Sequence, residues 1–388
     1  MHRSGAVIQR DLPQQLVESP ELVLGVLAVV MLAIVVGFIL RYLTRSPGER
    51  FDQLLRSLDD VAVLMHPNPD PDAMACALAA QCLAEDRDND VSLYYPGQIR
   101  HHENRAFETV LDVDFDRIAQ LGEIDENDVL LVDHNEPRGF EGADKLDPIA
   151  VVDHHPGDGT GVRFTDVRTD NGACATIFAE YFKSLGWVPV SPDELDQEER
   201  GAKMIPPRIS TALLYGIQSD TKQLTNGCSA AEFDAAAFLY NGIDPDKLDR
   251  IATPDMDAES LEVKARAITD RDVRGAFAVS DVGTVSNADA IPQAADELRR
   301  LEGVNAVVVL GEKNGTLQLS GRSTDDRVHM GKVLETAVEL VPMAGAGGHA
   351  RMGGGQIPID HMEGLGPGEG ITREELIQRL FDAMNGEI

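Results

Sequence analysis

From Val61 onward, short apolar segments alternate with longer segments of helical periodicity. Four apolar segments are typical of buried strands: Val61–Met65, Val91–Tyr95, Val129–Val132 and Ile149–Val152. Four segments are typical of helices: Asp72–Glu85, Ala173–Leu185, Pro207–Ile217 and Ala230–Tyr240. Because parallel strands need long crossover connections, this alternation predicts an α/β fold with a parallel sheet covered on both faces.

A second, smaller α/β domain is predicted after a polar connector. Further strands are expected at Gly275–Val282, Ala306–Leu310 and Thr316–Leu319, with helices at Ala288–Leu301, Val328–Leu340 and Thr372–Met384. The length of 388 residues also exceeds that of one typical domain. We therefore expect a first domain at 51–243, a linker at 244–270, a second domain at 271–388, and a cleft between the two domains.

The N-terminal region contains an uncharged apolar segment, Leu22–Leu40, of 19 residues. As a helix it is roughly 28 Å long, close to the thickness of the hydrocarbon layer. Arg41, Arg45 and Arg50 follow, which favours a cytoplasmic C-terminal side. The prediction is an N-terminal tail and transmembrane helix in residues 1–45, with a single pass through the cell membrane and both later domains in the cytoplasm. A cleaved signal peptide and a buried core helix are the alternatives.

The charge balance is strongly acidic, with 66 Asp and Glu against 34 Lys and Arg, for a net charge of −32. Such a surface either serves solubility alone or indicates adaptation to a very salty, halophilic cytosol, where salt screens the self-repulsion. It disfavours long duplex nucleic acid, whose affinity grows with the number of phosphates that cationic side chains neutralise. A small anionic substrate remains compatible.

Acidic and histidine residues follow three predicted strands and one predicted helix. The first strand runs into His66, Asp70 and Asp72, the third into Asp133, His134, Asn135 and Glu136, the fourth into Asp153, His154 and His155, and the helix into Asp220. Parallel strands end at one edge of the sheet, so these side chains are expected to lie together. Clustered carboxylates stay ionised only beside cations. Oxygen and nitrogen ligands without thiolate suit a divalent ion such as manganese. The alternative is that each Asp caps a helix or turn.

The segments HPNPDPD, VDHNE, VDHH and SDT together resemble the four motifs of the DHH phosphoesterase superfamily, in order and spacing, along Asp52–Tyr240. The resemblance implies two bound manganese ions, with Mg²⁺ or Co²⁺ as possible substitutes. One ion would be held by His66, Asp70 and Asp133, and the other by Asp72, Asp133, His154 and Asp220. Asp153 would orient a ligand, and His155 would face the substrate phosphate.

The second domain contains an arginine after a strand and a glycine-rich segment. The strand runs into Ser320-Gly-Arg322-Ser323, and the segment Gly345–Gly355 includes Gly347, Gly348 and His349 and is expected to be a loop. Glycines let backbone N–H groups approach an anion closely. The SGRS and GGH pair resembles the DHHA1 domain. The resemblance implies that Arg322, Ser323, Gly347, Gly348 and His349 bind the remote phosphate or nucleoside of the substrate.

The resemblance as a whole implies a manganese-dependent phosphoesterase acting through a two-metal-activated water. Expected substrates are short oligoribonucleotides, adenosine 3′,5′-bisphosphate or cyclic dinucleotides, and a homodimer is possible. Three alternatives remain open: an inorganic pyrophosphatase or exopolyphosphatase, a non-catalytic membrane nucleotide sensor, and a processive single-strand exonuclease. All six predicted metal positions carry ligand-type residues, which disfavours the sensor.

Overall fold

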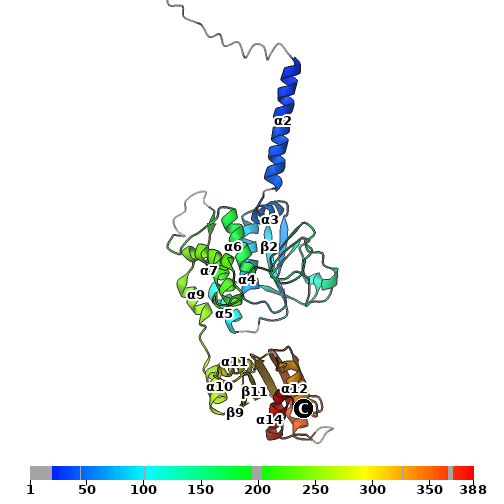
Figure 1. Cartoon of the computed structure of the whole chain (residues 1–388), viewed down its shortest axis with the longest axis vertical. Coiled ribbons are helices and arrows are strands. Elements are labelled where there is room, and N and C mark those ends of the chain that lie inside the picture. The colour runs from blue at the N-terminus through cyan, green and yellow to red at the C-terminus, as the bar shows by residue number, and fades with distance from the viewer. Residues whose placement is uncertain (1–19, 44, 100–101, 195–202, 326, 366–369) are drawn as a thin grey trace, which may run out of the picture. The chain divides into compact units, whose positions relative to one another are not determined.

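The computed structural model describes residues 20–43, 45–99, 102–194, 203–325, 327–365 and 370–388, and the chain divides into two units, Met1–Thr253 and Pro254–Ile388 (Figure 1). The first unit contains, in chain order, α2 (Pro20–Leu43), α3 (Pro47–Leu55), β1 (Asp60–Leu64), α4 (Pro71–Glu85), β2 (Asp90–Pro96), α5 (His102–Leu111), β3 (Asp116–Ile118), η1 (Leu121–Glu123), β4 (Val129–Val132), η2 (Ala143–Lys145), β5 (Ala150–Asp153), β6 (Phe164–Val167), α6 (Cys174–Ser184), β7 (Val188–Pro189), β8 (Met204–Ile205), α7 (Pro207–Asp220), α8 (Ala230–Leu239), η3 (Tyr240–Gly242) and α9 (Pro245–Ala252).

The second unit contains α10 (Ala258–Thr269), β9 (Asp272–Arg274), β10 (Phe277–Thr284), α11 (Ala290–Leu298), β11 (Ala306–Lys313), β12 (Thr316–Ser323), α12 (Met330–Val338), β13 (Gly345–Gly348), β14 (Met352–Pro358), α13 (Ile359–Met362) and α14 (Arg373–Asn385). Both units thus mix helices with strands, as the sequence predicts.

The main sheet of the first unit is parallel throughout, in the order β3-β2-β1-β4-β5-β6, which confirms the predicted fold class. Strand β1 shows why its sequence is apolar at successive positions. Val61 and Val63 face the larger core, to which α4, α6 and α7 contribute, whereas Ala62 and Leu64 face a smaller cluster on the other side. Both faces of the strand are buried, so neither face needs polar residues.

Helix α4 begins at the carboxyl edge of this sheet. The Asp70 carboxylate accepts a hydrogen bond from Ala73 N at 3.1 Å, and Pro71 occupies the first helical position, so the sequence sets the start of the helix. The neighbouring helix α7 approaches closely through Gly216, because a Cβ there would lie 3.1 Å from the Cα of Asp72. This local geometry brings Asp72 and the end of α7 together.

The second unit is built on a mixed sheet in the order β13-β14-β12-β11-β10-β9. Only β10 and β11 pair in parallel, and the other pairs are antiparallel. Helices α10 and α11 cover one face, where Ala278 and Val307 are buried. Helices α12 and α14 cover the opposite face over Val279 and Val308.

The predicted glycine-rich loop is instead a β-hairpin, so that expectation was wrong. Strand β13 pairs with β14, and β14 pairs with β12 from Thr316 to Arg322. Glycines carry no side chains whose alternation would mark a strand, which is why the pattern was missed. The segment 364–370 was also expected to be a loop, and its residues 366–369 lie outside the described residues.

The predicted transmembrane helix is not supported. Helix α2 covers the predicted segment, and residues 1–19 lie outside the described residues. Within the part of the chain that the structure describes, no helix has an apolar stretch long enough to cross a membrane.

The predicted adaptation to salt leads to a test of stability. At a net charge of −32, raising KCl from 0.1 to 2 M is expected to increase the Tm of the full chain by about 4 °C or more. The cause is shortening of the Debye length from about 10 Å to under 3 Å, which weakens repulsion between carboxylates. Circular dichroism melting at matched pH measures the shift, and 2 M sorbitol serves as the uncharged control. A Tm that is insensitive to KCl would leave solubility alone as the reason for the charge.

Candidate metal centre

The predicted metal residues meet at the carboxyl edge of the parallel sheet. His66 lies just beyond β1, Asp133 directly follows β4, and His154 directly follows β5. Asp72 lies in the first turn of α4, and Asp220 is the last residue of α7. Five segments of the chain therefore deliver their side chains to one place.

A first group consists of His66, Asp70 and Asp133, whose nearest ligand atoms lie within 4.8 Å of one another. His66 Nε2 lies 3.6 Å from Asp70 Oδ2 and 3.4 Å from Asp133 Oδ2. Asp70 therefore caps α4 with one oxygen and faces His66 with the other, so the helix-cap alternative and the predicted ligand position hold together.

A second group consists of Asp72, His154 and Asp220. His154 Nε2 lies 3.9 Å from Asp72 Oδ2 and 3.6 Å from Asp220 Oδ2. It also lies 3.4 Å from Asp133 Oδ1. Asp133 thus directs one oxygen to each group, as a bridging ligand does.

Both imidazoles are oriented by backbone carbonyls. His66 Nδ1–H donates to the carbonyl of Pro67 at 3.0 Å, and His154 Nδ1–H donates to that of Asn171 at 3.1 Å. The Nε2 atoms are therefore left to accept a metal ion, an arrangement typical of metal-binding histidines. His134 differs, because it is buried and burial lowers its pKa to about 4, which keeps it neutral.

Asp72 is held from behind by helix α6. Its Oδ2 accepts a hydrogen bond from Cys174 N at 2.6 Å, and its Oδ1 accepts one from Ala175 N at 2.8 Å. The positive end of the helix dipole faces this buried carboxylate and favours its charged form.

The buried polar atoms fit a bound cation. Among the described residues, both oxygens of Asp133 and Nε2 of His154 are buried without a hydrogen-bond partner. Unpaired buried carboxylate oxygens are costly unless a cation compensates them. Asp133 also has a φ of +61°, and strained backbone of this kind concentrates at functional sites.

Without metal, the cluster balances its charges with protons. Burial lowers the pKa of His66, but the nearby carboxylates of Asp133 and Asp70 outweigh it and raise the pKa to about 11. The same competition, led by burial and Asp133, raises the pKa of His154 to about 10. Burial and the charge of Asp70 raise the pKa of Asp220 to about 7. Burial raises the pKa of Asp72, whereas the two imidazoles outweigh burial and lower that of Asp133.

These shifts predict that metal binding releases protons. At pH 7 both His66 and His154 are protonated in the metal-free protein, so each ion must displace at least one proton. The affinity of the protein for the metal ions should therefore increase as pH rises from 6 to 8, by about tenfold per pH unit for each displaced proton. Calorimetric titration of Mn²⁺ in two buffers of different ionisation enthalpy counts the protons. An affinity that does not change with pH would contradict this electrostatic description.

Asp153 aligns the two neighbouring histidines. Its Oδ1 accepts the backbone N–H of His154 at 2.8 Å and Nδ1–H of His155 at 2.9 Å. The bond to Asp153 raises the pKa of His155 and favours the protonated imidazole. The side chain of His155 is 47% exposed, which suits contact with a substrate, and it also lies close to Asp133 and His154.

In the second unit, the guanidinium of Arg322 already has hydrogen-bond partners within the protein. Its Nε and Nη2 donate to Asp296 at 2.8 and 3.2 Å, and Nη1 donates to Ser320 Oγ and the carbonyl of Gly321 at 3.1 and 3.0 Å. Asp296 is half-exposed and lies in α11. A bidentate contact of Arg322 with a phosphate therefore requires the guanidinium to break its hydrogen bonds either with Asp296 or with Ser320 and Gly321.

The other predicted substrate residues have different surroundings. Ser323 is buried, and its hydroxyl contacts the carbonyls of Asn305 and Asp325. Gly347 and Gly348 lie in β13, where they pair with Gly354 and Gly353. His349 is exposed directly after that strand.

Comparison with known proteins agrees with these observations. The N-terminal domain of the DHH family matches residues 60–217, and the DHHA1 domain matches residues 274–386. An uncharacterized protein of Methanocaldococcus jannaschii is 33% identical over 82% of this chain, and the match spans 61% of that relative's length. Cyclic-di-AMP phosphodiesterase PdeA of Listeria monocytogenes is 24% identical over 70% of this chain and 41% of its own length.

Two further matches cover different shares of the chain. Cyclic-di-AMP phosphodiesterase GdpP of Geobacillus thermodenitrificans is 30% identical over 53% of this chain and 29% of its own length. The crystal structure of an exopolyphosphatase-related protein from Bacteroides fragilis covers 88% of this chain and 96% of its own, with a TM-score of 0.57 and 15% identity, which shows the fold alone. The chain therefore contains a region that matches the N-terminal domain of the DHH family, followed by a region that matches the DHHA1 domain.

Proposed function

We propose that this protein is a metal-dependent phosphodiesterase that hydrolyses cyclic dinucleotides and short linear oligonucleotides. The observation that carries the proposal is the pair of histidine and carboxylate groups that meet at Asp133. Such a pair suits two divalent ions, and oxygen and nitrogen ligands favour Mn²⁺, with Mg²⁺ or Co²⁺ as substitutes.

Different residues of the chain have different roles around such a metal centre. When bound, two divalent ions supply a water of lowered pKa and neutralise charge on the phosphoryl group. His66 and Asp70 hold one position, whereas Asp72, His154 and Asp220 hold the other. Asp153 keeps the imidazole of His155 aligned, and the protonated imidazole donates a hydrogen bond to a phosphoryl oxygen as negative charge develops there.

The substrate class rests on the relatives and on the second unit. Two of the matching proteins are named as cyclic-di-AMP phosphodiesterases. The second unit has a largely buried guanidinium at Arg322 and an exposed imidazole at His349, which suit a phosphate remote from the attacked one. Attachment to a membrane, a cytoplasmic location and dimer formation stay predictions from the sequence.

A substrate panel tests the proposal. With Mn²⁺ and the full chain, we expect hydrolysis of cyclic di-AMP and of linear di- to pentanucleotides to exceed that of pyrophosphate and polyphosphate by at least about tenfold. The reason is that a nucleotide offers groups beyond the attacked phosphate, and one further charge-assisted contact to them would contribute about 1.5 kcal/mol or more. Product formation is followed by chromatography, with EDTA as the metal-free control. Rapid turnover of pyrophosphate with no nucleotide cleavage would instead identify a pyrophosphatase.

A further inference from the structure

The loop between β1 and α4 carries two residues of the first metal position, which consists of His66, Asp70 and Asp133. Between His66 and Asp70 the chain reads Pro67-Asn68-Pro69. Asn68 has a φ of +57°, in the left-handed region, although the residue before a proline is normally extended. A loop in such a conformation keeps its shape only where surrounding contacts hold it. The placement of Asp70 relative to His66 therefore depends on the neighbours of this loop.

The segment after strand β2 holds the middle of the loop. Asn68 N donates to the carbonyl of Pro96 at 3.0 Å, and Asn68 Oδ1 accepts the backbone N–H of Gln98 at 3.0 Å. Gly97 lies between these two partners with a φ of +85°, and a Cβ there would lie 2.7 Å from Asn68 Oδ1. Glycine at position 97 is what allows the two segments to lie so close together.

Helix α5 holds the end of the loop through a buried side chain. Nδ2 of Asn104 donates a hydrogen bond to the carbonyl of Pro69 at 2.8 Å, and the two residues are 35 positions apart. Asn104 is 5% exposed, and Pro69 is also buried. The carbonyl of Pro69 belongs to the peptide group that joins it to Asp70. The bond from Asn104 therefore fixes the direction in which the chain enters this ligand.

The second metal position has a separate support. Asp72 accepts hydrogen bonds from the N–H groups of Cys174 and Ala175 in α6. His154 donates to the carbonyl of Asn171, just before that helix. These three bonds do not involve α5. The two metal positions thus share Asp133 but are supported by different parts of the chain.

We propose that Asn104 is a positioning residue for the first metal position, which it fixes through the carbonyl of Pro69, and that the second position does not depend on it. The proposal rests on the metal dependence of the proposed function. Loss of the Asn104 amide would take the hydrogen-bond donor from a buried carbonyl and leave the peptide group before Asp70 less restrained. Residues that orient metal ligands in this indirect way typically change metal affinity by about ten- to hundredfold.

Titration of the metal-free full chain with Mn²⁺ measures this effect without any turnover. We expect Asn104→Leu, which keeps the size of the side chain and removes the donor, to weaken binding at the first position about tenfold or more. Binding at the second position should change by less than about twofold. Calorimetry measures the two affinities, and electron paramagnetic resonance distinguishes a coupled pair of Mn²⁺ ions from a single ion.

A double-mutant cycle identifies the position on which Asn104 acts. Asn104→Leu and Asp70→Asn affect the same position, so their effects on Mn²⁺ affinity should not add. Asn104→Leu and Asp220→Asn affect different positions, so their effects should add. A purely structural role of Asn104 would give the same coupling to Asp70 as to Asp220.

Asn89 provides a matched control for the loss of a buried amide. It is also 5% exposed, and its Nδ2 donates to the carbonyl of Leu58. Leu58 and Asn89 precede strands β1 and β2, so this bond lies at the amino edge of the sheet, opposite to the metal centre. Asn89→Leu should lower the Tm about as much as Asn104→Leu does and leave both Mn²⁺ affinities unchanged. Asn104→Ala removes the same donor without adding apolar atoms, and it serves as the second variant if the leucine does not fit.

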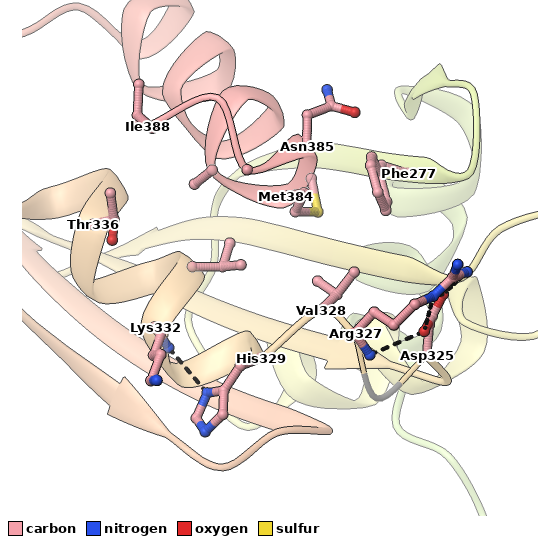
Figure 2. Close-up of a pocket in the computed structure, with 13 residues that line it drawn as sticks. Phe277, Asp325, Arg327, Val328, His329, Lys332, Thr336, Met384, Asn385 and Ile388 are labelled. Carbon is pink, nitrogen blue, oxygen red and sulfur yellow. Dashed lines mark hydrogen bonds and ion pairs between the residues drawn. The ribbon is translucent and has the colours of Figure 1, made fainter.

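Binding of Mn²⁺ outside the metal centre is controlled with a variant of the second unit. His329 lines a cavity of about 550 Å³ there, in which Arg327 pairs with Asp325 (Figure 2). His329→Asn removes this imidazole and keeps a side chain that can cap α12. It should leave both Mn²⁺ affinities unchanged.

The positioning role of Asn104 is refuted if the folded leucine and alanine variants bind both ions like the parent, or if they weaken both ions equally. With two ions bound to the parent, either result leaves the proposed metal-dependent function intact. A parent chain that binds no Mn²⁺ would refute the proposed function and the role of Asn104 together. Circular dichroism confirms that each variant is folded.

Discussion

Replacing Asp133 with asparagine is expected to lower phosphodiester hydrolysis by about a thousandfold or more. Asp133 is fully buried and directs one oxygen to His66 and the other to His154, so the substitution affects both metal positions at once. A loss of about 4 kcal/mol in transition-state stabilisation corresponds to that factor. The amide has nearly the same shape as the carboxylate, so the fold should survive. Initial rates with Mn²⁺ measure the loss of hydrolysis, and mass spectrometry measures the loss of bound metal.

Asp144→Asn is the matched control for this substitution, since Asp144 is an exposed aspartate of the same unit. It should retain full activity and two bound ions. The assignment of Asp133 as the shared ligand would be wrong if Asp133→Asn kept both ions and turned over substrate at the parent rate.

Replacing Arg322 with alanine is expected to lower kcat/KM for nucleotides about ten- to hundredfold, with metal content unchanged. The change would remove the proposed charge-assisted contact between Arg322 and a remote phosphate, worth about 1.5–3 kcal/mol. A small phosphodiester without a second phosphate should be cleaved at the parent rate, because it never reaches Arg322. Steady-state kinetics on both substrates measure the difference.

Controls for Arg322 must separate substrate contact from packing, because this side chain is nearly buried and holds Asp296. Arg322→Lys keeps the charge and loses the planar fork, so it should restore stability more than nucleotide cleavage. Arg300→Ala removes an exposed guanidinium of the same unit and should have no effect. An equal loss on the small phosphodiester would show that Arg322 acts on the fold.

The position of the metal residues was predictable because each follows an apolar segment directly. Asp133 follows Val129–Val132, and His154 follows the strand that ends at Asp153. Once such segments are assigned to a parallel sheet, their ends must meet at one edge. The strands β3 and β6 were not predicted, since their segments DRI and FTDV are short and half polar.

The contacts that orient these residues were not predictable. The carbonyl of Asn171 and the N–H groups of Cys174 and Ala175 are backbone groups, which any residue supplies in the same conformation. The pairing of Arg322 with Asp296 joins two ordinary surface-type residues 26 positions apart. No spacing rule distinguishes that aspartate from its neighbours in α11.

The two hydrogen bonds that helix α6 donates to Asp72 have a consequence for folding during protein synthesis. The two N–H donors lie 102 and 103 residues after Asp72, and Asp220 lies later still. Closing so long a loop requires the intervening strands to be in place first. A ribosome-bound chain that ends before Cys174 therefore has His66, Asp70 and Asp133 but cannot complete the second half of the site. Loading with two ions would mark the point at which the first unit has finished folding.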